Sequence, residues 1–309
     1  MAIEQKRFRV LSLNLWVSAV HVENGLEKVA KHIDILEPDI IALQEVMNDT
    51  TVPEIIQLLK EPNKWKYAHT EDSASTAIIS KYPIDEKSIS TTGYSIHATI
   101  QLNDGISLEF WSVHTQYVAY GPHAAYNRMV TDVKQILEGE NSPPGQGRVQ
   151  NVNEILESKE MLKAKHKVDT TPIIIAGDFN SPSHLDWTHK TSDLHHSWVI
   201  EWPSTSLLEQ AGFNDSYRVV HPDVLTNPGH TWSTCHKSNG EWNYAIPEPQ
   251  DRIDFIFYQG PLKPLSSSPY AGTEPLHPIP NHCDNDWPSD HYALVTDFSF
   301  NIPNFRSRL

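Results

Sequence analysis

The sequence predicts an α/β protein in which two packed sheets carry helices on their outer faces. Short apolar runs rich in β-branched residues recur along the whole chain, as expected for strands. Between them lie segments whose apolar residues recur at the helical period. Several of the apolar runs also end in an acid, an amide or a histidine. A strand end is held rigidly while the following loop stays open to ligand, so such groups can be aimed at a reacting molecule.

Six predicted strands deliver polar residues in this way. They are residues 8–16 with Asn14, 39–46 with Glu45, 106–114 with His114, 171–180 with Asp178 and Asn180, 252–258 with Asp254, and 287–295 with Asp290 and His291. Each one taken alone is explained equally well as a capped turn or a satisfied buried polar group. The recurrence in six strands is much harder to explain by chance, and it predicts one shared site.

Amphipathic helices are predicted between these strands, at residues 21–36, 52–60, 126–137 and 152–167. In the first of them Val22, Leu26 and Val29 follow the helical spacing and would lay one face on a sheet. Residues 139–147, which are rich in glycine and proline, are predicted to form a mobile loop.

Length and composition predict a single domain over residues 1–309, because no linker divides the chain. Hydrophobic residues make up 39% and the mean hydropathy is −0.45. No apolar run approaches the ~18 residues of a membrane span. Residues 1–7 lack the apolar stretch of a secretory signal, which favours the cytoplasm and leaves an exported form open.

The two cysteines, Cys235 and Cys283, exclude a dense disulfide framework. They would pair with each other only in an oxidising compartment, so the sequence leaves free thiols and one disulfide as alternatives.

The ordered set of motifs resembles the endonuclease/exonuclease/phosphatase superfamily over nearly the whole chain. The matching segments are Leu13-Asn14, Leu43-Gln44-Glu45, His114, Gly177-Asp178-Phe179-Asn180, Arg252-Ile253-Asp254 and Ser289-Asp290-His291. One departure is Ser-Val-His-Thr at residues 112–115, where the family usually has Asn-Thr-His-Leu. The resemblance implies a four-layer α/β/β/α sandwich of two packed mixed sheets with outer helices. It identifies the superfamily more specifically than the substrate.

The resemblance also implies metal-dependent phosphoester hydrolysis. A catalyst of this reaction must neutralise the phosphate oxygens and help the leaving oxygen depart. Glu45 and Asp290 are the expected ligands of one or two Mg²⁺ or Mn²⁺ ions, since carboxylate oxygens suit these metals. Asn14 is expected close to the metal and to a phosphate oxygen.

The resemblance implies that Asp178 orients and deprotonates the attacking water. It also implies that Asn180 fixes the geometry of Asp178 and contacts the phosphate. His291 is expected to contact a phosphate oxygen while Asp254 holds its other ring nitrogen. His114 is expected in the catalytic and substrate-binding set.

Substrate identity is less well determined by the sequence. Lys and Arg number 24 against 39 for Asp and Glu, a net charge of −15, which does not favour a long nucleic acid duplex as partner. Two loops, residues 231–244 and 266–288, are expected to control entry. His184, close after Asn180, is a candidate on the substrate rim.

A rival zinc site is suggested by the cluster His184, Asp186, His189, Asp193, His195 and His196. Its spacing matches no familiar zinc pattern, so Mg²⁺ or Mn²⁺ is preferred.

The leading hypothesis is a divalent-metal-dependent phosphodiesterase acting on a nucleotide, a short nucleic acid or a small phosphorylated metabolite. The alternatives are a phosphomonoesterase for a phosphoinositide or sugar phosphate, and a catalytically inactive binding module. The sequence leaves the oligomeric state open.

Overall fold

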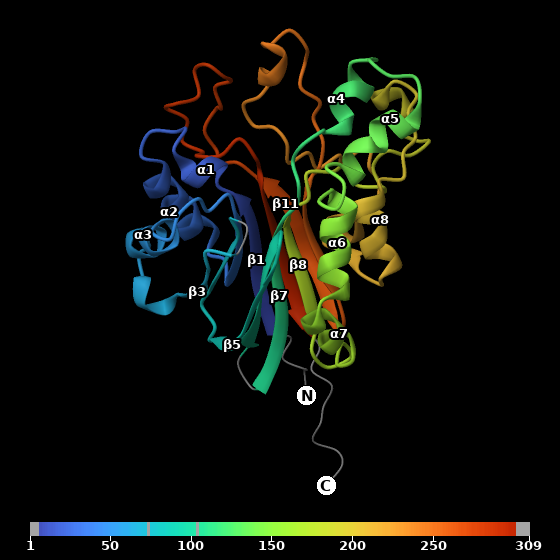
Figure 1. The fold of residues 1–309 in the computed structure, drawn as a ribbon. Coiled ribbons are helices and arrows are strands. Elements are labelled where there is room, and N and C mark those ends of the chain that lie inside the picture. Colours follow the sequence, from blue (N-terminus) through green and yellow to red (C-terminus); the bar gives the residue numbers. More distant parts are fainter. Residues whose placement is uncertain (1–5, 73–74, 103–104, 301–309) are drawn as a thin grey trace.

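Two six-stranded mixed sheets pack face to face, with helices on both outer faces (Figure 1). The computed structural model describes residues 6–72, 75–102 and 105–300, so most of the amino-terminal segment considered above (residues 1–5) lies outside the described residues. The predicted four-layer sandwich is confirmed.

The first sheet has the strand order β11-β12-β1-β2-β4-β3, and the second has the order β5-β6-β7-β8-β10-β9. The strands of the first sheet are β1 (Lys6–Asn14), β2 (Ile40–Gln44), β3 (Lys66–Ala68), β4 (Ala77–Ser80), β11 (Leu262–Tyr270) and β12 (Ala293–Phe300). Those of the second are β5 (Ile84–Thr92), β6 (Ser95–Leu102), β7 (Ile106–His114), β8 (Ile173–Asp178), β9 (Asn214–Asp215) and β10 (Asp254–Gln259).

The alternation of side chains along each central strand divides the core into layers. On β8, Ile174 and Ala176 pack in the central core between the sheets. Ile173 and Ile175, on the other face of the same strand, pack beneath the outer helices. Because both faces are covered, the strand is apolar throughout and reads as a continuous run in the sequence.

The outer layers are formed by amphipathic helices. α2 (Gly25–Leu36) and α3 (Thr51–Leu58) cover the first sheet. α6 (Arg148–Glu157), α7 (Lys159–Lys165) and α8 (Pro203–Gln210) cover the second (Figure 1). The remaining helices are α1 (Trp16–Ala19), α4 (Gly121–Tyr126), α5 (Val133–Leu137) and α9 (Ser216–Val220), with short 3₁₀ turns η1 (Pro62–Lys64), η3 (Glu138–Asn141), η4 (Ser192–His195) and η5 (Gly240–Trp242).

Three sequence predictions of local structure were wrong. The helix expected at residues 126–137 is two short helices, α4 and α5, and Asp132 caps the second. The helix expected at 152–167 is interrupted at Ser158, whose side chain accepts a hydrogen bond from Met161 N and starts α7. The expected mobile loop at 139–147 begins with η3, where Glu140 is buried. In the first two cases a local side-chain cap restarts the helix and interrupts the helical period.

Strand direction brings the polar strand ends together. β1 and β2 are parallel, with Asn14 opposite Gln44, and β7 and β8 are parallel, with His114 opposite Asp178. β10 is antiparallel to β8, so its first residue, Asp254, also lies opposite Asp178. The loops that precede β10 and β12 rise at this same end of the molecule, beside α1 and α4 (Figure 1).

Two further expectations concern membranes and thiols. Within residues 6–72, 75–102 and 105–300, no helix combines the length and apolar character needed to cross a bilayer. Cys235 is buried and Cys283 is exposed, and both are free thiols.

The loop expected at 266–288 starts later, because residues up to Tyr270 belong to β11.

Candidate active site

Asp178, the last residue of β8, is the point at which the polar strand ends meet. Its Oδ2 accepts a hydrogen bond from Asn14 Nδ2 at 3.0 Å, and its Oδ1 accepts one from Asn180 N at 2.8 Å. The Nε2 atoms of His114 and His291 both lie 3.7 Å from Oδ2. Residues from far-apart stretches of the chain therefore converge on a carboxylate that is almost completely buried.

Glu45 lies next to this group and is also held firmly. Its Oε1 accepts a hydrogen bond from Asn14 Nδ2 at 3.1 Å, and its Oε2 accepts one from Val17 N at 2.6 Å. Asn14 thus bridges the carboxylates of Glu45 and Asp178. Its own Oδ1 accepts a hydrogen bond from Trp16 N at 2.9 Å, and its side chain is buried. Both N–H groups and one oxygen lone pair of the amide are therefore engaged, which fixes its orientation, and the contact with a metal or a phosphate that the sequence predicts stays a prediction.

The backbone that holds Glu45 is in a rare conformation. Residues 16–19 form a left-handed turn, with φ of 50° at Trp16, 57° at Val17, 54° at Ser18 and 59° at Ala19. Left-handed backbone costs about 1–2 kcal/mol per residue in amino acids with a Cβ atom. The turn directs Val17 N at the Glu45 side chain and Ser18 N at the Glu45 carbonyl oxygen, 2.9 Å away. Strain of this kind persists where the surroundings fix it, which is common at functional sites.

His291 and Asp254 form a buried pair, with His291 Nδ1 2.9 Å from Asp254 Oδ2. Burial lowers the pKa of His291, but the carboxylates of Asp254 and Asp178 outweigh this effect and raise it to about 10. Burial raises the pKa of Asp254 to about 6, against the lowering effect of His291. The proton therefore stays on the histidine at neutral pH, and the pair consists of an imidazolium and a carboxylate.

Asp290 lies beside a histidine that the sequence analysis did not single out. His236 Nε2 is 3.1 Å from Asp290 Oδ2. The His236 ring stacks on Trp232, with ring centroids 5.0 Å apart, and Trp232 also contacts the His291 ring at 4.8 Å. The aromatic loop at 231–244 was expected to border the site, and Trp232 does so; the position of His236 depends on tertiary packing.

These groups line one cleft of about 380 Å³. Its walls include four acids and four histidines together with aromatic side chains; the residues are Trp16, Val17, Glu45, His114, Tyr117, Tyr120, His123, Asp178, Asn180, Trp232, His236, Asn239, Gly240, Glu248, Ile253, Asp290 and His291. Asn14 and Asp254 lie behind this surface and contact the lining residues. Tyr117, Tyr120, His123 and Glu248 do not follow the strand-end pattern, so they could not be predicted from the sequence.

His184 does not join the cleft, contrary to expectation. Its Nδ1 lies 3.0 Å from Thr205 Oγ1 and its Nε2 2.7 Å from Glu209 Oε2, which ties it to α8. The rival zinc cluster is not assembled either. Asp186 forms ion pairs with Arg218 and Arg252. Asp186 is thus paired with two guanidinium groups, and His184 is bound to α8. These two side chains have no shared position for a metal.

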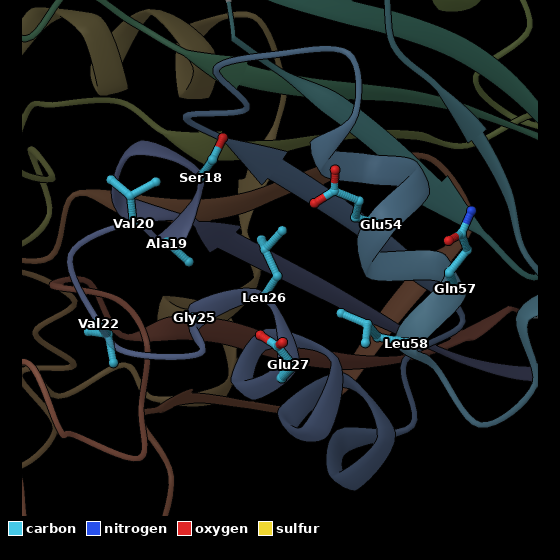
Figure 2. A pocket seen from close by; sticks show the side chains of 10 residues that line it. All are labelled: Ser18, Ala19, Val20, Val22, Gly25, Leu26, Glu27, Glu54, Gln57 and Leu58. Atoms are coloured by element: carbon cyan, nitrogen blue, oxygen red, sulfur yellow. The ribbon is translucent and has the colours of Figure 1, made fainter.

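A second and larger cavity, of about 610 Å³, lies between α1, α2 and α3 (Figure 2). It is lined mainly by apolar groups such as Val20, Leu26 and Leu58, with the carboxylates of Glu27 and Glu54. No histidine or aspartate is among its described lining residues. This cavity therefore lacks the combination of acids and histidines that lines the cleft at the strand ends.

Comparison with known proteins identifies the fold and the family. A model of the Endonuclease/Exonuclease/phosphatase family matches residues 11–291. The chain belongs to this family. An uncharacterised protein of Caenorhabditis elegans is 45% identical over 294 residues, which cover 94% of this chain and 91% of that protein.

Solved structures of the family share the fold at low sequence identity. TDP2 from C. elegans has a TM-score of 0.58 at 16% identity, covering 96% of this chain and 76% of that one. A family member from Beutenbergia cavernae has a TM-score of 0.59 at 15% identity, with 96% and 72% covered. D. rerio TDP2, solved with a single-strand DNA product, has a TM-score of 0.56 at 14% identity, with 95% and 99% covered.

Members of this family are metal-dependent hydrolases of phosphoester bonds, and the residues of the cleft fit a divalent cation. Asp178, Asp254 and His291 bring one ligand atom each within 4.8 Å of one another, so this buried group could hold a metal. An imidazolium has no lone pair to donate, however, so a protonated His291 is a poor ligand. Glu45 and Asp290 supply carboxylate oxygens at the same cleft, which suit Mg²⁺ or Mn²⁺ better.

Proposed function

We propose that this protein is a divalent-metal-dependent phosphodiesterase whose active site is the cleft around Asp178. The observation that carries the proposal is the convergence of Asn14, Glu45, His114, Asp178 and His291, which come from separate strand ends, on one cleft. Carboxylates for a metal lie there beside a buried imidazolium, and both kinds of group can stabilise the charge that develops in phosphoester hydrolysis.

The proposed metal ligands are Glu45 and Asp290, for one or two Mg²⁺ or Mn²⁺ ions. When bound, the ion would neutralise charge on the phosphate and its leaving oxygen. Asn14 would keep the Glu45 and Asp178 carboxylates in place through its two hydrogen bonds. His236 would restrain Asp290 in the same way.

Asp178 is the proposed base. It would take a proton from the attacking water, whose oxygen bonds to phosphorus as the opposite phosphorus–oxygen ester bond breaks and the leaving oxygen takes a proton from solvent. Asn180 Nδ2 donates a hydrogen bond to Thr115 O at 3.0 Å, which holds the Asn180 side chain rigidly. Its side-chain oxygen is left to contact the substrate or the attacking water. His114 lines the same wall.

His291 is the proposed electrophilic group. Its Nδ1 is bound to Asp254, so Nε2, which points toward Asp178, is the nitrogen that would donate to a nonbridging phosphate oxygen. The charge is present before the substrate arrives, and a preorganised positive charge stabilises the extra negative charge of the transition state.

The test is hydrolysis of bis-p-nitrophenyl phosphate, p-nitrophenyl phosphate, and single-stranded and duplex DNA, each with Mg²⁺, Mn²⁺ or a chelator. Cleavage of the diester with either metal and none with chelator is expected. Faster cleavage of the monoester would favour the phosphomonoesterase, and absence of all turnover would favour a binding module.

The variant Asp178→Asn tests the assignment of the base. It keeps the size of the side chain and an oxygen that can accept from Asn180 N, and it removes the proton acceptor. Loss of turnover by 10²-fold or more is expected, in line with general-base catalysis. Turnover near the wild-type rate would remove Asp178 from the mechanism.

A further inference from the structure

The cleft around Asp178 is unusual for a phosphate-binding site in the charges of its walls. Neither lysine nor arginine occurs among the described residues that line it, whereas Glu45, Asp178, Glu248 and Asp290 all do. Proteins that hold several phosphates at once do so with lysine and arginine. In this cleft the positive charge is confined to the histidines and to the metal proposed above.

Three basic side chains that contact or adjoin lining residues do not themselves line the cleft. The Nη atoms of Arg148 donate to the carbonyl oxygens of Gly139, Tyr117 and Val118. Lys237, next to His236, is exposed and does not line the cleft, and its Nζ lies 3.4 Å from Ser233 O. Arg252 is buried against Asp186 and Asp215. Arg148 and Arg252 are therefore not available as counter-charges for a second phosphate in the cleft.

The lining of the cleft includes another buried carboxylate that takes no part in the Asp178 group. Glu248 accepts hydrogen bonds from Trp232 Nε1 at 2.9 Å and Asn239 Nδ2 at 2.9 Å, and lies 2.7 Å from His123 Nε2. Burial raises the pKa of Glu248, but these hydrogen bonds, led by that of His123, outweigh it and lower the pKa. The carboxylate therefore repels any further anionic group that enters the cleft.

The cleft also has aromatic side chains in its lining, among them Tyr117. The side chain of Tyr117 is 66% exposed. Its backbone is nevertheless fixed, since Tyr117 N donates to Gln116 Oε1 at 3.1 Å and Tyr117 O accepts from Arg148 at 3.2 Å. An exposed ring on a restrained loop loses little conformational freedom when a planar group packs on it. Tyr120, three residues further on, also lines the cleft.

We infer that the substrate of this cleft is a phosphodiester with a single phosphate, whose remaining ester group is uncharged and planar and packs on Tyr117. The inference rests on the proposed function and narrows it. It excludes polyphosphorylated metabolites and strands in which several consecutive phosphates must be held in the cleft.

A matched pair of esters tests the charge requirement. One is the p-nitrophenyl ester of thymidine 5′-monophosphate, and the other is the same molecule with a second phosphate on the 3′ oxygen. Both have the same scissile bond and leaving group. We expect kcat/KM to be at least about tenfold lower for the doubly phosphorylated ester at low ionic strength, and the difference to shrink as salt is added.

Gly240→Lys should reduce this discrimination, with Gly240→Gln as the uncharged control. Gly240 lines the cleft, and a Cβ added there would approach other atoms no closer than 3.7 Å, so the first atom of either side chain is accommodated. The ratio of the two kcat/KM values should fall several-fold in the lysine variant and stay near the wild-type ratio in the glutamine variant.

Tyr117→Ala tests the planar group with phenyl and methyl esters of p-nitrophenyl phosphate. The preference of the wild type for the phenyl ester should fall about fivefold or more, a loss in the range of one stacking contact. Equal kcat/KM for the singly and doubly phosphorylated esters, or an unchanged phenyl preference in Tyr117→Ala, would overturn the inference and leave the proposed function standing. Hydrolysis of none of these esters would overturn both.

Discussion

Replacing Asp254 by asparagine isolates the charge that this residue contributes to the site. Asp254 is fully buried and does not line the cleft, and its side chain is hydrogen-bonded to the proposed catalytic residue His291. Asparagine keeps an oxygen that can accept the hydrogen bond from His291 Nδ1, so the orientation of the ring is retained. Without the carboxylate the pKa of His291 falls, because burial then opposes the charged ring with less compensation.

The size of the effect follows from the 2.9 Å hydrogen bond between the two side chains. A hydrogen bond to a charged partner contributes about 1.5–3 kcal/mol, and a neutral one about 0.5–1.5 kcal/mol. The variant should thus lose about 1–1.5 kcal/mol of transition-state stabilisation, or roughly tenfold in kcat. Asp254→Ala, which also removes the acceptor and the orientation of the ring, should lose up to about 100-fold.

The assay is kcat for bis-p-nitrophenyl phosphate at saturating Mn²⁺, together with the Mn²⁺ concentration that gives half-maximal rate. The metal requirement should change little in both variants, since Asp254 is not a proposed ligand. Asp251→Asn is the control: Asp251 is another buried carboxylate of the same segment, bound to Trp187 Nε1 and Tyr120 Oη. It should lower the melting temperature and leave kcat within about twofold.

Two results would contradict this reasoning. If Asp254→Asn retained the wild-type kcat, the charge of the His291–Asp254 pair would have no part in turnover. If both Asp254 variants instead lost activity together with their affinity for Mn²⁺, Asp254 would be a metal ligand, as its grouping with Asp178 and His291 also permits.

Three further predictions concern stability. Gly177→Ala should lower the free energy of unfolding by at least about 1–3 kcal/mol in urea denaturation, because its Cβ would lie 1.9 Å from Val113 O on the neighbouring strand; a wild-type midpoint would contradict this packing. Arg252→Lys should cost about 3–5 kcal/mol by the same measurement, since lysine cannot reproduce the guanidinium bonds to two buried carboxylates. Burial lowers the pKa of His195 from 6.5 to about 4 in the folded protein. As pH falls, His195 is therefore protonated in the unfolded chain before it is protonated in the folded one. The contribution of neutral His195 to the free energy of unfolding is lost as pH falls from 6.5 toward 4. His195→Phe keeps a ring stacked on Trp187, and its melting temperature should decline less than that of the wild type over this pH range; parallel curves would exclude His195 as a cause.

The part of the candidate site that lies at strand ends could be predicted from the sequence. Asp178 and His114 end apolar strands whose direction is set by the parallel pairing of β7 and β8, so their adjacency could be predicted from pattern and resemblance. The left-handed turn at Trp16–Ala19 could not be predicted, because none of its residues prefers that conformation and only the contacts around Glu45 impose it. His184 shows the opposite failure: closeness in sequence to Asn180 suggested a place in the site, whereas its bonds to α8 hold it outside the cleft.

By itself the sequence determined the layers of this protein and the types of residue at its candidate active site. The apolar runs and the helical period require buried strands under outer helices, and the acids, amide and histidines at strand ends are local features that survive in any arrangement of those strands. The walls of the cleft were decided only by tertiary structure. Tyr117, His236 and Glu248 come from loops whose course depends on packing between distant segments, and the free energy that fixes them arises from contacts with no counterpart in the local sequence.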